Sequence, residues 1–454
     1  MRRVVKSPRL SPIVLASLIS LSAAAQAPFV LSASLTGMSN VRGVTAADVN
    51  GDGKPDLICV GTPNLLFVWT NSGTGQFVSN RSYTLGTLPR QVIAVDVNGD
   101  GSLDLITANV SGNSLSVLTN DGTGGFTLAA TLRLGASSQP RSVAAADLFG
   151  RGKPDLISAN SLLASFTVWT NIGAGNFVSN FSLSVGSPGF TVPEWAAAAD
   201  LNGDGKMDII GACNNSDTRY LHLWTNNGAG GFAPAPVPFL DPFLNGFDVA
   251  VPTDINGDGK PDLVLATEWI SDSNRVTVLT NNGSGELVLA GYSLLTAVPN
   301  GLAVADVDGD GQLDVIAAIG PSVTSLIVLT NGGAGVFGFN TNITIASNPE
   351  TVAAADVNGD GRYDLISGNL NTFSGMSVFT NAAAFTPRLA LKRSGTDVIV
   401  SWPAIWASWN LQQTTNLAAG NWTSFSGPIG NDSINKIATN PASADIRFFR
   451  LSNP

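Results

Sequence analysis

The chain has 454 residues and a formal net charge of −10 at pH 7. Charged residues make up only 12% of it, glycine is abundant, and β-branched residues crowd the apolar runs. This composition favours an all-β globular protein over a disordered one. Without a basic stripe to neutralise phosphates, nucleic acid is not an expected partner.

Residues 1–25 are predicted to be a secretory signal peptide. Four basic residues precede the apolar run 13–21, and Ala23-Ala24-Ala25 offers a cleavage site. The run is shorter than the ~18–20 residues that a membrane span needs, and no later segment qualifies. We therefore expect a secreted or cell-surface protein whose mature part has no membrane span.

A nine-residue motif recurs from residue 48 onward. Residues 48–56 read Asp-Val-Asn-Gly-Asp-Gly-Lys-Pro-Asp, with oxygen-bearing side chains at positions 1, 3, 5 and 9 and glycines at 4 and 6. Successive copies lie 48, 51, 53, 54, 52 and 50 residues apart, and this near-constant period predicts stacked supersecondary units. Complete copies begin at Asp48, Asp96, Asp200, Asp254, Asp306 and Asp356, and an altered copy begins at Asp147.

Each complete copy is predicted to bind Ca²⁺, which selects hard oxygen ligands at short spacing. The glycines allow the positive φ values that fold such a loop around an ion. EF-hands are not expected, because position 12 is never Glu and a strand-like run follows the loop. We expect about six ions, which stabilise the fold rather than regulate binding. Position 7 would contribute its backbone carbonyl. The predicted ligands are Asp48, Asn50, Asp52, Lys54, Asp56, Asp96, Asn98, Asp100, Ser102, Asp104, Asp200, Asn202, Asp204, Lys206, Asp208, Asp254, Asn256, Asp258, Lys260, Asp262, Asp306, Asp308, Asp310, Gln312, Asp314, Asp356, Asn358, Asp360, Arg362 and Asp364.

The altered loop, Asp147–Asp155, has Phe149 and Arg151 where other copies have ligand residues. We predict that this loop binds no ion. The guanidinium of Arg151 is expected to bridge Asp147 and Asp155 in place of a cation.

Each repeat predicts four antiparallel strands, which in the second repeat fall at 90–95, 105–108, 115–118 and 127–134. The first two strands should be buried and the third half-exposed. Four strands per repeat of about 50 residues predict one propeller blade, and seven blades close a ring. The strand 29–34 is expected to pair with 376–380 and complete the last blade, which leaves no open edge.

A second motif, Thr-Asn-x-Gly-x-Gly-x-Phe, follows the first; it stands at residues 70–77 and recurs from Thr170 and Thr225. The two motifs in fixed order resemble the FG-GAP/VCBS repeats of integrin α-subunit-like propellers, over roughly residues 28–384. The resemblance implies a seven-bladed β-propeller with Ca²⁺ between the first two strands of each blade. Residues 385–454, with short strands and tryptophans, look like an immunoglobulin/fibronectin type III-like module, a small β-sandwich.

A candidate ligand-binding face follows from the same plan. The residues six positions before each metal loop, together with the longer loops of blades four and five, should share one channel mouth. Exposed aromatics beside hydrogen-bonding groups suit carbohydrate or peptide capture. The ring residues are Arg42, Arg90, Arg141, Glu194, Asp248, Asn300 and Glu350, basic on one side and acidic on the other, and the loop residues are Trp195, Arg219, Tyr220 and Trp269.

No common catalytic signature is found in the sequence: it has no Gly-x-Ser-x-Gly elbow and no His-Glu-x-x-His helix. The only histidine, His222, is expected to be solvent-exposed on a third strand. Cys59 and Cys213 should lie in blades too far apart for a disulfide and are interpreted as small buried hydrophobes.

The sequence thus predicts an exported, monomeric, calcium-stabilised propeller that acts in adhesion or in recognition of an extracellular glycan or protein. Two alternatives stay open. One is a carbohydrate-active enzyme, such as a polysaccharide lyase, for which Arg219 and Tyr220 are suggestive residues. The other is a purely structural surface protein.

Overall fold

A computed structural model describes most of the chain beyond residue 28. Two compact units lie within residues 27–384 and 385–454. No helix of the described part is long and apolar enough to cross a membrane. The predicted signal peptide, residues 1–25, lies outside the described residues. The described ranges are 29–215, 221–237, 246–267, 274–333, 335–370, 375–382, 389–394, 397–403, 410–415, 421–431, 435–441 and 447–452.

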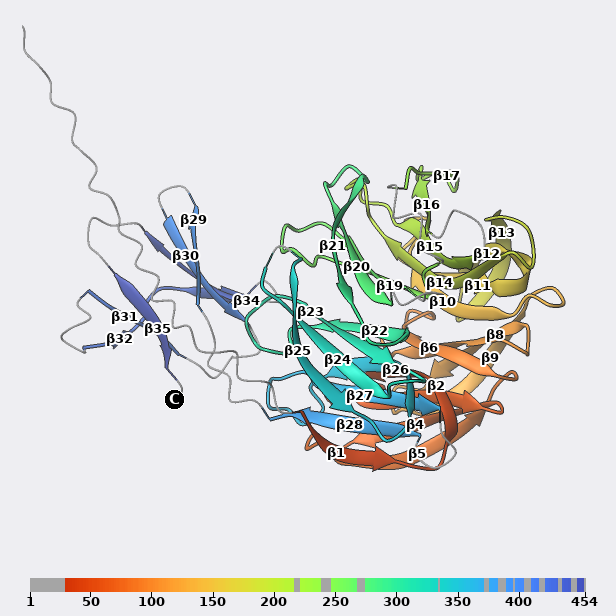
Figure 1. Ribbon diagram of the computed structural model, residues 1–454, viewed down its shortest axis with the longest axis horizontal. Coiled ribbons are helices and arrows are strands. Elements are labelled where there is room, and N and C mark those ends of the chain that lie inside the picture. The colour runs from red at the N-terminus through yellow and green to blue at the C-terminus, as the bar shows by residue number, and fades with distance from the viewer. Residues whose placement is uncertain are drawn as a thin grey trace, which may run out of the picture. The chain divides into compact units, whose positions relative to one another are not determined.

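The larger unit consists of four-stranded antiparallel sheets, seven of them in the described residues, each of the first six formed by four consecutive strands (Figure 1). The first sheet contains β2 (Ser39–Ala47), β3 (Asp56–Thr62), β4 (Leu65–Asn71) and β5 (Phe77–Thr84). The second contains β6 (Pro89–Val95), β7 (Asp104–Asn109), β8 (Ser114–Asn120) and β9 (Phe126–Arg133). The third contains β10 (Pro140–Ala146), β11 (Asp155–Asn160), β12 (Ser165–Gly173) and β13 (Asn176–Ser184), with the short 3-10 helix η1 (Ser161–Leu163) between β11 and β12.

The fourth sheet contains β14 (Thr191–Ala199), β15 (Asp208–Asn215), β16 (Leu221–Asn226) and β17 (Phe232–Pro234). The fifth contains β18 (Val249–Thr253), β19 (Asp262–Thr267), β20 (Arg275–Asn281) and β21 (Leu287–Leu294). The sixth contains β22 (Pro299–Ala305), β23 (Asp314–Ile319), β24 (Ser325–Asn331) and β25 (Phe337–Thr344).

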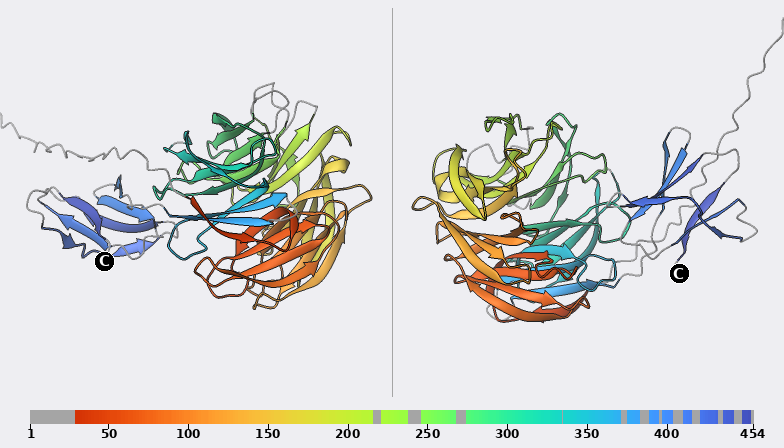
Figure 2. Two further views of the ribbon diagram at one scale, coloured as in Figure 1. Left: turned by 60° about the horizontal axis from the view of Figure 1, so that its bottom comes forward. Right: turned by 180° about the vertical axis from the view of Figure 1, so that it is seen from behind.

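The last sheet joins the two ends of the repeat region. It contains β26 (Asn348–Ala355), β27 (Asp364–Leu370), β28 (Met376–Asn381) and the N-terminal strand β1 (Phe29–Leu35). In this sheet β1 pairs antiparallel with β28, from Phe29 opposite Asn381 to Leu35 opposite Met376 (Figures 1 and 2). This confirms the expected pairing of the N-terminal strand.

Apolar side chains from neighbouring sheets form the core between them. One cluster joins Val49 and Val60 of the first sheet to Leu105 of the second. Another joins Cys59 of the first sheet to Ile366 and Val378 of the last. The first and last sheets are therefore packed together like any other neighbours. Cys59 and Cys213 are both unpaired and buried, as predicted.

The expected half-exposure of the third strands is wrong for most of the sheets, although β4 of the first sheet does alternate between half-buried and buried residues. The first seven residues of β8, β12 and β20 are all buried except the sixth. By contrast, the fourth strands β9 and β21 are mostly exposed. A third strand is interior to a sheet that packs on both faces, so the fourth strand takes the outer edge.

In its described residues the smaller unit has two sheets. The first runs in the order β29 (Ala390–Ser394), β30 (Asp397–Pro403), β34 (Asn435–Pro441) and β33 (Ile429–Asn431), and the second in the order β32 (Thr423–Ser424), β31 (Asn410–Thr414) and β35 (Phe448–Ser452). Trp402 is 1% exposed and lies in a core with Val400, Leu411 and Ala438. This tryptophan therefore serves packing.

Candidate functional site

The predicted metal loops connect the first and second strands of each sheet. In the first loop, Gly51 and Gly53 have φ values of 75° and 80°, which L side chains rarely adopt. The carboxylate of Asp48 accepts backbone N–H bonds from Gly51 at 2.8 Å and Gly53 at 2.7 Å. The glycines thus wrap the backbone around the first aspartate.

The ninth-position aspartate of each loop is completely buried, as Asp56 illustrates. Its Oδ2 accepts the N–H of Val49 at 3.3 Å, and its Oδ1 accepts the N–H of Asn71 at 2.8 Å. Each carboxylate oxygen has a second lone pair available for another partner. The carboxylate therefore ties its loop to the third strand and can still act as a ligand.

Burial raises the pKa values of these carboxyl groups, because desolvation disfavours the charged form. It raises the pKa of Asp364 to about 6. For Asp314, burial and then the nearby charge of Asp308 raise the pKa to about 8. A divalent cation would reverse this penalty by pairing with the ionised form.

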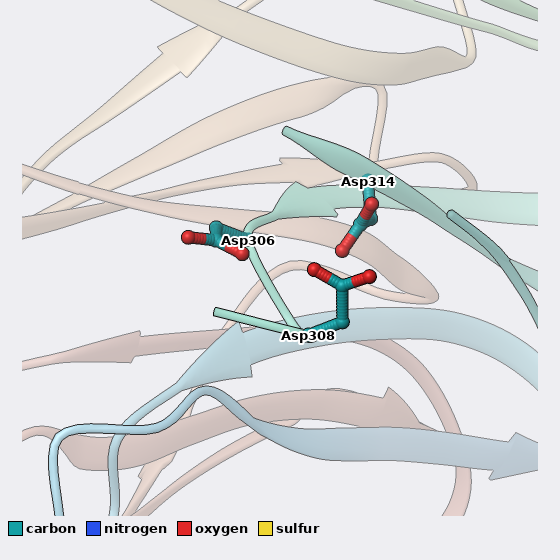
Figure 3. Close-up of side chains that lie close together, drawn as sticks. All are labelled: Asp306, Asp308 and Asp314. Atoms are coloured by element: carbon teal, nitrogen blue, oxygen red, sulfur yellow. The ribbon is translucent and has the colours of Figure 1, made fainter. Parts of the chain in front are cut away.

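Three carboxylates converge in the sixth sheet's loop (Figure 3). Oxygens of Asp306, Asp308 and Asp314 lie within 4.8 Å of one another, and Asp308 points toward Asp314. Two oxygens bound to one Ca²⁺ at 2.3–2.6 Å lie at most about 5 Å apart. The spacing is thus geometrically compatible with one ion. The other complete copies have Asn at position 3. In the first loop this residue is Asn50, whose Oδ1 accepts the backbone N–H of Asp52 at 2.9 Å.

The seventh position places a cation beside the fifth-position carboxylate in four loops. These pairs are exposed or half-exposed, with N–O distances of 3.1 to 3.8 Å, so each contributes little to stability. They are Lys54–Asp52, Lys206–Asp204, Lys260–Asp258 and Arg362–Asp360.

The altered third loop contains the predicted internal cation, but only half of the expected bridge. The Arg151 guanidinium pairs with the buried Asp155 and lies over the Phe149 ring, 5.1 Å from its centroid. Among the described residues, Asp147 instead accepts the backbone N–H groups of Arg151 at 2.9 Å and Gly152 at 2.6 Å. The guanidinium is directed to Asp155 because this carboxylate is the buried one.

Sequence reasoning missed a set of buried asparagines that link the sheets. Each lies at or close to the end of a third strand. Its Nδ2 donates both to a carbonyl of its own loop and to the second-position carbonyl of the preceding sheet's loop. Asn120, for example, donates to Val49 at 2.8 Å and to Leu103 at 2.9 Å. The sequence feature that could have revealed these asparagines is the Thr-Asn pair, which occurs in all seven repeats. The links to the preceding sheet are Asn71–Val357, Asn120–Val49, Asn171–Val97, Asn226–Leu148, Asn281–Leu201, Asn331–Ile255 and Asn381–Val307.

The seven residues predicted to ring a channel mouth do line one cavity, of about 190 Å³. In six sheets the ring residue lies in the first strand, at a point where the register with the second strand shifts. Such a shift marks a β-bulge, which changes the direction of a side chain. Asp248 instead immediately precedes β18. Trp195 also lines the cavity, but it lies in β14 and not in a loop as predicted. Arg219, Tyr220 and Trp269 lie outside the described residues. The bulge residues are Arg42, Arg90, Arg141, Glu194, Asn300 and Glu350.

Ion pairs connect the basic and acidic parts of the ring. Arg141 Nη1 lies 2.6 Å and 2.8 Å from the two carboxylate oxygens of Glu194, which is 4% exposed. Arg90 Nη2 lies 3.8 Å from the same carboxylate. Arg42 Nη1 lies 3.6 Å from Glu350. With three arginines and three acids, the ring is formally neutral.

The expected exposure of His222 is wrong. Its counterparts in other sheets include Ser116, Thr277 and Ile327, each at most 2% exposed. His222 itself is half-buried and stacks on Trp224 with centroids 5.7 Å apart. The third strand is interior, so this position faces packing neighbours.

The fold and loops define an all-β protein built from repeated four-stranded sheets. The chain belongs to the FG-GAP-like repeat family, whose model matches residues 48–107, 96–158, 147–211, 200–265, 254–317 and 306–367. Among curated proteins, no match is found.

Solved structures resemble the chain at the level of fold. A proposed 6-phosphogluconolactonase from Bacteroides uniformis is 14% identical, covers 69% of this chain and 88% of its own, and has a TM-score of 0.54. A second one, from Bacteroides fragilis, is 15% identical, with 69% and 86% covered and a TM-score of 0.53. An Agrocybe aegerita lectin described as recognising non-reducing terminal N-acetylglucosamine is 22% identical, with 69% and 81% covered and a TM-score of 0.44.

Proposed function

We propose that the chain is an exported, calcium-stabilised, seven-bladed β-propeller of the integrin α-like type, which acts as a recognition or adhesion module for an extracellular glycan or protein. The C-terminal unit would be its immunoglobulin/fibronectin type III-like sandwich. The observation that carries the proposal is the loop recurring in successive sheets, with a buried aspartate at its end and two glycines at positive φ, as in Asp56, Gly51 and Gly53.

Calcium fits this loop for a chemical reason. Each complete copy gathers three or four carboxylates, and without a cation their mutual repulsion and burial oppose folding. Position 1, 3, 5 and 9 side chains and the position 7 carbonyl would hold the ion. In the third blade, the Arg151 guanidinium would take over the charge of the missing ion, since it pairs with Asp155.

Recognition is favoured by the neutral, polar channel mouth and by the family membership. The arginines and acids that line it offer directional hydrogen bonds. Arg219 and Tyr220, on which the lyase alternative depends, lie outside the described residues. Binding is proposed here on the strength of the polar mouth and the repeat family, and the assay for unsaturated products tests the lyase alternative directly.

Calcium counting and ligand screening test the proposal together. Metal analysis of protein dialysed against calcium should find about six ions per chain, and EDTA should lower the melting temperature. Glycan and extracellular-protein arrays should then give binding that EDTA abolishes and calcium restores. Protein that binds no calcium, or that turns polysaccharide into unsaturated products, would contradict the proposal.

A further inference from the structure

We propose that the channel mouth binds the carboxylate group of a small ligand through Arg42 and Arg90. This inference rests on the proposed recognition function and names the chemistry that the propeller would recognise.

Bulges and a close strand contact bring the two arginines together. Arg42 and Arg90 fall at bulges in β2 and β6, and both line the cavity. A Cβ built on Gly43 would lie 2.6 Å from the carbonyl oxygen of Arg90, so only glycine lets the two strands approach this closely. Two arginines from neighbouring sheets therefore line the same cavity, where Arg42 faces Glu350 and Arg90 faces Glu194.

The terminal nitrogens of Arg42 and Arg90 have hydrogen-bonding capacity to spare, whereas Nη1 of Arg141 is engaged, although Arg141 Nε, like Arg42 Nε, has no partner among the described residues. Arg141 is held within 2.8 Å of both oxygens of the buried Glu194. The ion pairs of Arg42 and Arg90 are 3.6 Å and 3.8 Å long, beyond normal hydrogen-bond distance. Arg42 Nε is buried and has no hydrogen-bond partner among the described residues. A planar oxyanion is the natural acceptor for such donors.

Charge and size select a carboxylate over other anions. Because the ring is formally neutral, it lacks the net positive charge that a phosphate dianion would need more than a carboxylate monoanion does. The cavity of about 190 Å³ is smaller than the ~300–1,000 Å³ typical of pockets for drug-sized ligands. It would therefore take one terminal group, supplied either by a free small acid or by an acidic sugar.

The test is calorimetric titration of the full chain in calcium with acetate, glucuronate, glucose and inorganic phosphate. We expect glucuronate and acetate to bind and glucose not to bind. If acetate binds as tightly as glucuronate, the carboxylate group alone determines recognition. If glucuronate binds more tightly, the sugar contributes to the affinity as well. Arg42→Gln and Arg90→Gln should each weaken binding at least about tenfold, as for a lost charged hydrogen bond.

Arg133→Gln is the matched control, because Arg133 is exposed on β9 and does not line the cavity. It should leave affinity unchanged, and unchanged melting temperatures of all three variants would show that they fold. The inference is wrong if no carboxylate binds, if phosphate or glucose binds as tightly, or if Arg42→Gln and Arg90→Gln bind like the wild type. A protein that binds calcium and an array ligand, but no small carboxylate, would contradict this inference and leave the proposed function standing.

Discussion

The Nδ2 of Asn71 in the first sheet donates a 2.8 Å hydrogen bond to the carbonyl oxygen of Val357 in the last sheet, 286 residues away. The same side chain bonds Pro55 of its own loop at 3.0 Å. Together with the pairing of β1 and β28, this bond holds the first and last sheets together. It is the same link that joins every other neighbouring pair, and at this seam the pairing of β1 with β28 is added to it.

Replacing Asn71 with Ala should destabilise the protein by about 1–3 kcal/mol, because one buried and one half-buried carbonyl group lose their donor. Urea unfolding measures the change. Asn80→Ala on the exposed part of β5 is the matched control and should cost little. Equal stability of the two variants would mean that the asparagine link is dispensable.

The Asp308→Ala variant should lose one calcium ion, because Asp308 is one of three carboxylates that converge in its loop. Metal analysis after dialysis should fall from about six ions per chain to about five. Asp147→Ala, in the loop expected to bind no ion, should leave the count unchanged. If Asp308→Ala kept the full count, this loop would not be a site.

Converting the third loop to the common pattern should create a site. Phe149→Asn with Arg151→Asp restores oxygen donors at positions 3 and 5, so we expect one additional ion by metal analysis. Arg151→Ala alone removes the cation beside the buried Asp155 and adds no ligand. It should destabilise the fold by about 1–3 kcal/mol without changing the ion count. A double variant that binds no additional calcium would show that the local backbone is not competent to hold an ion.

Without calcium, the protein should be more stable in mild acid than at neutral pH. Burial raises the pKa of Asp364 to about 6 and that of Asp314 to about 8. A carboxyl with a raised folded-state pKa stabilises the fold while protonated, and this contribution is lost as pH rises through those values. In EDTA, the melting temperature should therefore fall between about pH 5 and pH 8.

Excess calcium should remove or reverse this trend, because the ion binds the ionised carboxylates and is displaced by protons. Melting curves recorded at several pH values, with and without calcium, provide the comparison. A metal-free protein that becomes more stable as pH rises would contradict the burial argument.

The repeat period and the loop chemistry could be predicted from the sequence because both are local. The glycines at positions 4 and 6 adopt the positive φ values that their spacing implied. The ring of residues six positions before each loop could also be predicted, since a constant period places equivalent positions around one axis. The pairing of residues 29–34 followed from counting strands.

Tertiary structure alone decided which groups become partners across sheets. Sequence spacing did not reveal that Asn71 reaches Val357, that Arg151 pairs with Asp155 and not Asp147, or that Glu194 engages Arg141 closely and leaves Arg90 at a distance. The burial of the third strands was missed for the same reason. Periodicity describes one strand at a time, whereas burial and ion pairing depend on what the neighbouring sheet places opposite it.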